Sequence, residues 1–420
     1  MKYKASYRGV LTLLFLLSTS CSSQTTPHNI IAKTEKQLTV LAQSVADKLE
    51  YQSLLFDINP NERFSPRTIN NDNELILVKR GDWTSGFYPG SLWYTYAMTG
   101  NKKTKSLALQ YTLPLAEEKN NGATHDMGFK VFCSFGNAYH LTLNSEYKSI
   151  LLTAAQTLST RFNEQVGAIR SWDHSSKKWA YPVIIDNMMN LELLFWASEV
   201  TGNQSYYDIA YQHAITTMEN HFRPDFSTYH VVDYNIETGQ VAQKNQHQGY
   251  KDESTWSRGQ AWALYGYTMC YRATKDKSFL ELANNIAGFI FHHPNLPSDL
   301  IPYWDYDAPN IPNEERDVSA AAITASALYE LSLYTSEKAH QYQEWATTIC
   351  DNLESNYSAA PGGSKGFILL SSTGSKAQNS EVDVPLNYAD YYFLEALYRQ
   401  KALERGTSIF LSDLKMNKNE

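Results

Sequence analysis

Asp126 and Asp186 are the residues of this 420-residue chain best suited to acid–base chemistry. Asp126 lies in the tract Thr124–Phe129 and Asp186 in the tract Tyr181–Asn190, and each carboxylate interrupts apolar residues just before a long helical pattern. A charged group in such surroundings costs solvation free energy unless something uses it. Paired carboxylates on neighbouring loops are the usual equipment for cleaving a glycosidic bond.

Each aspartate also has a purely structural interpretation. Asp186 could be the N-cap of the helix that follows it, and Asp126 could be a turn residue before Gly128. A capping carboxylate is held ionised by the helix dipole, which does not suit a proton donor. A catalytic acid needs a raised pKa, from burial or from a second carboxylate. Asp126 could be that second carboxylate if the two loops adjoin.

The tract Ser254–Trp262 is the clearest candidate for recognising a ligand. Arg258 carries a planar fork that matches a carboxylate, and Trp262 lies one helical turn further on. The alternative is that Arg258 pairs with a structural acid. His230 and Gln248 are polar residues that could bind a ligand or could equally form hydrogen bonds within the loops. The glycine-rich and aromatic segment 80–90 contains Trp83, which could form a wall of the site or simply belong to a tight helix entry.

The rest of the sequence excludes several other kinds of protein. It contains no HExxH helix, Walker loop, nucleophile elbow, dinucleotide fingerprint or CxxC spacing, so no metal or cofactor is expected. The net charge of −8 comes without a long basic run, which argues against nucleic acid as a partner. The chain has 29 Tyr and 9 Trp, whose flat faces suit sugar rings as well as an aromatic core. Cys133, Cys270 and Cys350 lie in apolar stretches and are expected to be buried thiols.

A repeated helical hairpin is expected to position these residues. Amphipathic helical runs break at regular places, where Gly or Asn ends one helix and Asn, Asp or Ser caps the next. These breaks are Thr99-Gly100-Asn101, Thr142-Leu143-Asn144, Thr201-Gly202-Asn203, Thr274-Lys275-Asp276 and Thr335-Ser336-Glu337. The first helical pattern, near Thr34–Leu54, and the last, near Tyr388–Ala402, would form a sixth pair. We therefore predict an all-α fold, an (α/α)6 toroid, over residues 34–405.

In such a toroid the loops at one rim build the active site. The tracts richest in Trp, His, Asp, Gly and Pro fall where this arrangement predicts. They are Arg80–Gly90, Thr124–Phe129, Tyr181–Asn190, Tyr229–Asp233, His247–Trp262 and Leu369–Asp390. No second domain is expected, and residues 406–420 are interpreted as a C-terminal tail.

The N-terminus has the layout of an export signal. Lys2, Lys4 and Arg8 precede a short apolar run, and small residues then precede Cys21. We expect residues 1–20 to be a signal peptide, Cys21 to carry a lipid, and residues 21–33 to form a polar tether. The alternative is a secretory signal cut nearby. The expected location is periplasmic or membrane-anchored, as a bacterial lipoprotein without an obligate protein partner.

Taken together, these tracts resemble the unsaturated glucuronyl hydrolases of glycoside hydrolase family 88. The resemblance covers about residues 35 to 402, and its strongest pieces are Trp83–Trp93, His125–Phe129, Asp186–Leu194, Trp256–Trp262 and Asn387–Tyr392. It implies an (α/α)6 barrel that acts on oligosaccharides left by polysaccharide lyases. Their non-reducing end is a uronate with a C4=C5 double bond. The implied reaction hydrates that bond, after which the sugar opens and expels its neighbour, without metal or organic cofactor.

The resemblance also implies roles for individual residues. Asp186 matches the general acid and base, and Asp126 matches the second essential aspartate. Substrate-site positions are matched by His125, His230, Gln248, Arg258 and Trp262, and a stacking position by Trp83. Ser372 and Lys376 lie in a loop that resembles the region contacting the leaving sugar and could accommodate a sulfate. A plain polar surface loop is the alternative there.

Three other functions stay open on the sequence. An unsaturated rhamnogalacturonyl hydrolase would share the fold and the double-bond chemistry. A conventional inverting glycosidase would also use two carboxylates. A surface-anchored sugar-binding lipoprotein would bind without turnover, although a binder of an anionic sugar gains nothing from two carboxylates at its site.

Overall fold

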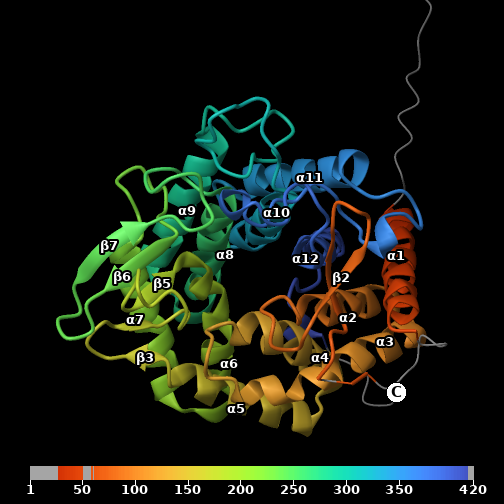
Figure 1. Ribbon diagram of the computed structural model, residues 1–420, viewed down its shortest axis with the longest axis horizontal. Helices are drawn as coiled ribbons and strands as arrows, with labels where there is room; N and C mark the ends of the chain where they lie inside the picture. Colours follow the sequence, from red (N-terminus) through yellow and green to blue (C-terminus); the bar gives the residue numbers. More distant parts are fainter. Residues whose placement is uncertain (1–26, 51–57, 60, 415–420) are drawn as a thin grey trace, which may run out of the picture.

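The structure is a ring of paired helices in which an inner set is surrounded by an outer set (Figure 1). This computed structural model describes residues 27–50, 58–59 and 61–414. The outer helices are α1 (Pro27–Lys48), α3 (Lys102–Thr112), α5 (Ser145–Ser159), α7 (Gln204–Asn220), α9 (Lys277–His292) and α11 (Ala339–Asn356). The inner helices are α2 (Phe87–Thr99), α4 (Asn137–Thr142), α6 (Leu191–Thr201), α8 (Ser257–Thr274), α10 (Val318–Leu331) and α12 (Asn387–Glu404). The predicted (α/α)6 toroid is confirmed.

Inner and outer helices differ in sequence because they differ in surroundings. Every residue of α10 is buried, and its many Ala and Ser residues let neighbouring helices approach closely. The outer helix α9 has a single apolar face, formed by Phe279, Leu282, Ala283, Ile286, Ala287 and Ile290. That spacing follows the helical period of an amphipathic surface helix. The sequence pattern therefore assigns each helix to its layer.

A left-handed helix end followed by a side-chain cap occurs at four of the five breaks, but only two of them have the predicted Gly. Gly100 and Gly202 adopt left-handed backbone angles, with φ of 68° and 70°, which end α2 and α6. Asn101 and Asn203 then accept a backbone N–H and cap the next helix. The breaks after α4 and α8 use Leu143 or Lys275 in the left-handed position. The break after α10 differs, because α10 ends at Leu331 without a left-handed residue.

The ring closes where α12 packs against α2 on one side and α10 on the other. Helix α1 packs on the outside of α2 and α3 and completes the outer layer (Figure 1). It begins at Pro27, inside the predicted tether of residues 21–33, and Ile30 and Ile31 are buried in the core. The tether prediction is therefore wrong from Pro27 onward, because these apolar residues continue the buried face of α1. Residues 1–26, including the predicted signal peptide and Cys21, lie outside the described residues.

The C-terminal tail prediction is also wrong up to residue 414. Ile409 and Leu411 are each 4% exposed, and the short 3-10 helix η6 (Leu411–Asp413) packs on α4. The ring of Phe410 lies 4.7 Å from the guanidinium carbon of Arg272. The prediction failed because the segment is short and its apolar residues, among them Ile409, Leu411 and Leu414, are too few to form a periodic pattern.

Several short antiparallel strands interrupt the helical pattern, and the sequence analysis did not anticipate them. Strands β1 (Ser65–Ile69) and β2 (Leu75–Val78) form a hairpin, and β3 (Phe162–Asn163) pairs with β4 (Ala168–Ile169). Strand β6 (Val231–Tyr234) lies between β5 (Pro182–Ile184) and β7 (Val241–Asn245). All belong to the long loops that connect outer helices to inner ones.

The interior of the ring carries a network of ion pairs between residues of α6, α8, α10 and α12. Arg272 pairs with Glu192 and lies 2.9 Å from Glu330, whereas Arg399 lies 3.2 Å from Glu330 and 3.6 Å from Glu395. These groups line or adjoin a cavity of about 590 Å³. Glu330, Glu395 and Arg399 are buried, and buried charges are tolerated when each is paired, so the interior of the ring holds them in ion pairs.

No helix among the described residues combines the length and apolar character that a membrane crossing requires.

Replacing Leu411 with alanine tests whether the C-terminal segment belongs to the fold. Removing a buried leucine side chain should lower the free energy of unfolding by about 2 kcal/mol or more. Urea denaturation followed by circular dichroism measures the change. The exposed neighbour Ser412 provides the control, since Ser412→Ala should leave the stability unaltered. Equal stability of both variants would mean that the segment contributes nothing.

Candidate active site

Asp186 lies where a short strand enters the inner ring. Strand β5 ends at Ile184, and the chain continues into the 3-10 helix η3 (Ile185–Asn190) and then α6. Ile184 is the N-cap residue of η3, so the Asp186 carboxylate is not used for capping. Asp186 is 7% exposed, and its Oδ2 atom has no hydrogen-bond partner with good geometry among the described residues. The carboxylate is therefore left for another role.

His230 faces Asp186 with one defined ring nitrogen. It precedes β6, the strand paired with β5, and its carbonyl accepts the Ile185 N–H at 3.0 Å. Its Nδ1 accepts backbone N–H groups from His247 at 3.3 Å and Gln248 at 3.2 Å. A nitrogen that accepts cannot carry a proton, so the proton of the neutral ring is on Nε2. Nε2 lies 3.4 Å from Oδ2 of Asp186, at the outer limit of a hydrogen bond.

The surroundings of Asp186 favour its ionised form. Burial raises its pKa, but the His230 N–H and the nearby His125 and Arg258 lower it, and the net pKa lies below the ordinary value. This differs from the raised pKa expected for a catalytic acid. The reason is that donors and positive charge around the buried carboxylate outweigh its desolvation. Without a ligand, Asp186 is a carboxylate at neutral pH.

Asp126 is held by its two preceding residues. The Thr124 hydroxyl donates a short hydrogen bond to Oδ2, and His125 Nε2 lies 3.2 Å from Oδ1. His125 is itself buried, and its backbone N–H donates to the Ser171 carbonyl at 3.1 Å. The Asp126 side chain keeps 18% of its surface exposed, so it is fixed in orientation yet reachable.

Asn190 joins the two aspartate loops. Its Oδ1 accepts the backbone N–H groups of Gly128 at 2.8 Å and Phe129 at 3.2 Å. The approach is so close that a Cβ atom on Gly128 would lie 2.7 Å from the Asn190 Cα. The predicted proximity of the loops is therefore met through Asn190, which sequence analysis did not single out. Its only signal was its position one helical turn after Asp186.

The guanidinium group of Arg258 is not free to bind a ligand, because its terminal nitrogens are hydrogen-bonded within the protein. One terminal nitrogen donates to Asp317 and to the Thr373 carbonyl, both at 2.6 Å, and the other donates to the Gly374 carbonyl. Asp317 is fully buried and also caps α10. The alternative interpretation, pairing with a structural acid, therefore describes this geometry better. Arg258 still contributes positive charge to the Asp186 environment.

The loop of residues 371–386 is held by hydrogen bonds from two of the predicted recognition residues, Gln248 and Arg258. Gln248 Nε2 donates to the Gly374 carbonyl at 2.9 Å, beside the Arg258 contact. Gln378 in the same loop donates toward the ring of His247 at 2.8 Å. The 371–386 loop is thus tied to the segment that also fixes the His230 ring.

The proposed sulfate contact of Ser372 and Lys376 does not fit the geometry. Lys376 Nζ lies 2.6 Å from Glu314 and also pairs with Glu315, so two carboxylates neutralise it. Burial would raise the pKa of Glu314, yet Lys376 and the Trp304 N–H bring it to about 2. Ser372 is fully buried in a backbone bridge to Val384. The pairing was invisible in the sequence because the two glutamates lie far from Lys376 along the chain.

The two predicted tryptophans occupy different layers. Trp83 is half-buried, with its ring 5.0 Å from Tyr388 and 5.5 Å from Phe129, so it can form a wall of the site. Trp262 is completely buried between Phe129, at 5.2 Å, and Tyr392, at 5.3 Å. Its ring therefore packs behind Phe129 and does not offer a face for stacking.

Trp172 and His247 form a second aromatic wall that sequence analysis missed. The Trp172 ring lies 5.4 Å from His247 and 6.3 Å from His230. Trp172 also forms a backbone bridge with Thr124, beside Asp126. It belongs to a loop without a distinctive motif, so only the folded chain reveals that it flanks both aspartate loops.

No three His, Cys, Asp or Glu side chains converge to hold a metal ion in the part of the chain that the structure describes.

A helical toroid that gathers two aspartates on adjoining loops at one end is an arrangement that suits a glycoside hydrolase. The family model described as Glycosyl Hydrolase Family 88 matches residues 61–285. The chain is 44% identical to an unsaturated glucuronyl hydrolase of Formosa agariphila, over 95% of this chain and 99% of that protein. The chain belongs to glycoside hydrolase family 88.

Solved structures agree with this assignment. A crystal structure of an unsaturated glucuronyl hydrolase specific for heparin superposes with a TM-score of 0.83. The match covers 90% of this chain and 98% of that chain, and the two sequences are 44% identical. A variant of the Streptococcus agalactiae unsaturated glucuronyl hydrolase, in complex with dGlcA-GalNAc6S, is 28% identical. Its TM-score is 0.72, over 89% of this chain and 90% of that chain.

The His230→Ala variant tests the electrostatic control of Asp186. Without the imidazole N–H, burial should raise the Asp186 pKa, so the protonated acid should persist to higher pH. The alkaline limb of the pH profile of kcat/KM, which reports the free enzyme, should therefore move to higher pH. His340 is exposed, so His340→Ala is the control variant. The alkaline limb of its kcat/KM profile should not move. A limb that stays in place or moves to lower pH in His230→Ala would contradict this account.

Proposed function

We propose that this hydrolase removes a 4,5-unsaturated glucuronate from the non-reducing end of oligosaccharides released by polysaccharide lyases. The observation that carries the proposal is the Asp186 carboxylate, buried and unused by the fold, facing the N–H of a histidine with a defined tautomer. The names of the relatives and the complex of one of them with an unsaturated disaccharide support the same substrate class.

In the proposed reaction, Asp186 transfers a proton to C4 of the unsaturated ring. The electron pair of the C4=C5 bond forms the new C4–H bond, and the ring oxygen stabilises the resulting cation at C5. Water then attacks C5 and returns a proton to Asp186. The product is a hemiketal that opens to a ketone at C5, and C1 expels the neighbouring sugar as an alcohol. Water is the only co-reactant consumed.

The lowered pKa of Asp186 in the free site fits this cycle if the substrate brings its own negative charge. The uronate carboxylate would add a like charge near Asp186 and raise its pKa. Binding would also exclude water and strengthen that effect. Protonation of Asp186 would then accompany substrate binding. When the cation forms at C5, the fixed carboxylate of Asp126 would stabilise it.

The other residues have positioning roles in this proposal. His230 orients the Asp186 carboxylate, and Asn190 keeps the Asp126 loop against η3. Trp83 and Trp172 supply flat faces for sugar rings. Arg258 and Gln248 act through the 371–386 loop, since both donate to the Gly374 carbonyl.

The proposal is tested with a panel of disaccharides made by lyases from glycosaminoglycans, ulvan and pectin. Hydration removes the conjugated enoate, so its ultraviolet absorbance should fall on adding the enzyme. Asp186→Asn should lower kcat at least about 100-fold because the proton donor is lost. The exposed Asp208 gives the matched control, Asp208→Asn, which should retain full activity.

The same panel separates the competing functions. Turnover of pectin-derived substrates alone would indicate an unsaturated rhamnogalacturonyl hydrolase. Hydrolysis of saturated glycosides would favour a conventional inverting glycosidase. Binding of unsaturated disaccharides without loss of absorbance would point to a sugar-binding protein and would reject the proposal.

We further propose that the enzyme is an exported lipoprotein anchored through Cys21. The support is the basic and apolar N-terminal pattern followed by small residues and a cysteine. In a bacterial host the full chain should partition into the detergent phase of a detergent–water extraction, because lipid chains favour that phase. Cys21→Ser should move it to the aqueous phase. Aqueous partitioning of the unaltered chain would indicate a plain secretory signal instead.

A further inference from the structure

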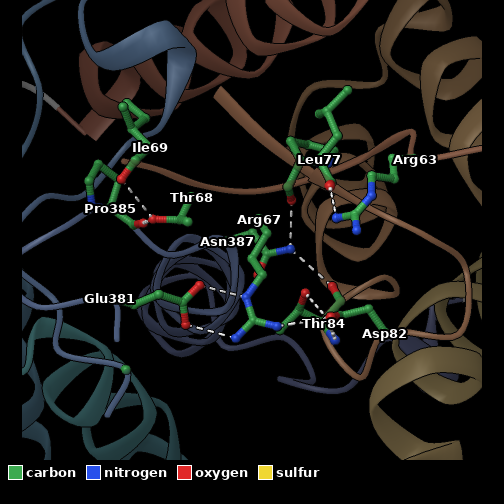
Figure 2. Close-up of polar contacts among 12 residues, drawn as sticks. Arg63, Arg67, Thr68, Ile69, Leu77, Asp82, Thr84, Glu381, Pro385 and Asn387 are labelled. Carbon is green, nitrogen blue, oxygen red and sulfur yellow. Dashed lines mark hydrogen bonds and ion pairs between the residues drawn. The ribbon is translucent and has the colours of Figure 1, made fainter. Parts of the chain in front are cut away.

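Arg67 on strand β1 joins two loops that are distant in the sequence. Its Nε and Nη2 form a two-point contact with Glu381, at 2.6 and 2.7 Å, and its Nη1 lies 2.9 Å from Asp82 (Figure 2). Glu381 belongs to the 371–386 loop, and Asp82 precedes Trp83. Planar two-point contacts between arginine and carboxylate are strong and directional, and lysine cannot reproduce them.

The contact continues from Glu381 towards the catalytic groups. The Glu381 carbonyl accepts the Gly374 N–H at 2.6 Å, and the Gly374 carbonyl accepts from Gln248 at 2.9 Å and from Arg258. The Gln248 N–H in turn donates to the His230 ring. A Cβ atom on Gly374 would lie 2.8 Å from the Cβ of Glu381, so Gly374 and Glu381 are packed too closely for a larger residue at position 374.

Arg67 also touches the aromatic wall of the site. Its guanidinium carbon lies 5.9 Å from the Trp83 ring, which lies 5.0 Å from Tyr388. Tyr388 in turn lies 5.3 Å from the guanidinium carbon of Arg258. Two separate routes, one polar and one aromatic, therefore connect Arg67 with Arg258. The Arg67 side chain remains 20% exposed, which suits a bracing position at the edge of the site better than a core ion pair.

We propose that Arg67 and Glu381 are positioning residues that set the 371–386 loop against the Trp83 wall and thereby determine which leaving sugars the enzyme accepts. The proposal rests on the function proposed above. We call the Arg67–Glu381 ion pair the brace. In the proposed reaction Asp186 transfers the proton and Asp126 stabilises the cation, and neither residue contacts the brace. Loosening the brace should therefore affect substrate binding on the loop side and spare the chemical step.

Arg67→Lys keeps the charge but removes the two-point contact. It should raise KM about tenfold, the loss of a charge-assisted contact, with kcat changed less than about twofold. The size of the KM change should differ between disaccharides that share the uronate but carry different leaving sugars. Glu381→Gln should have a similar effect, and the double variant should be no worse than either single variant. Equal loss for all leaving sugars, or multiplied losses in the double variant, would indicate a merely structural role.

Arg63→Lys is the matched control, because Arg63 lies just before the same strand, is exposed, and among the described residues donates only to the Leu77 carbonyl at 3.4 Å (Figure 2). Its kinetics should equal those of the unaltered enzyme. Hydrogen exchange provides a readout that needs no activity. Peptides covering residues 371–386 should exchange faster in Arg67→Lys than in Arg63→Lys. Unchanged exchange would overturn the brace, whereas an enzyme inactive on every disaccharide would instead overturn the proposed function.

Discussion

The inner helices of this ring are buried along most of their length, and this constraint organises the whole molecule. A buried charge is tolerated only when it is paired. Inside the ring the charges of α8, α10 and α12 form the ion-pair network around Arg272 and Arg399. At the N-terminal ends the loops supply the partners, and there Asp186 keeps an oxygen without a good partner among the described residues. The carboxylate proposed to carry the chemistry is therefore one whose pairing is incomplete.

The geometry of that end is set by backbone groups more than by side-chain charges. Two backbone N–H groups fix the His230 ring, and two more fix the Asn190 side chain. Backbone donors have no ionisable group and no rotamer of their own, so they hold both acceptors in one orientation. The pKa of Asp186 reflects burial opposed by nearby donors.

The fold and the two aspartates could be read from the sequence because their signals are local. A helix end and the next helix start are each indicated by two adjacent residues, as in Gly100-Asn101 and Gly202-Asn203. Partners distant in the sequence leave no such trace. Asp317 neutralises Arg258 and Glu314 neutralises Lys376, although the sequence suggested that both cations were free to bind a ligand. The packing of Ile30 and Leu411 was missed because a few buried side chains can anchor segments that are polar overall.

The anchoring of the 371–386 loop has a consequence for protein engineering. Its contacts come from β1, from the segment around Glu314 and from the start of α8. A loop transplanted from a relative would arrive without these partners, and it would deprive Arg67 of Glu381 and Arg258 of two backbone carbonyls. Exchanging substrate preference between relatives therefore requires moving the loop together with its anchors, as one discontinuous module spread over most of the chain.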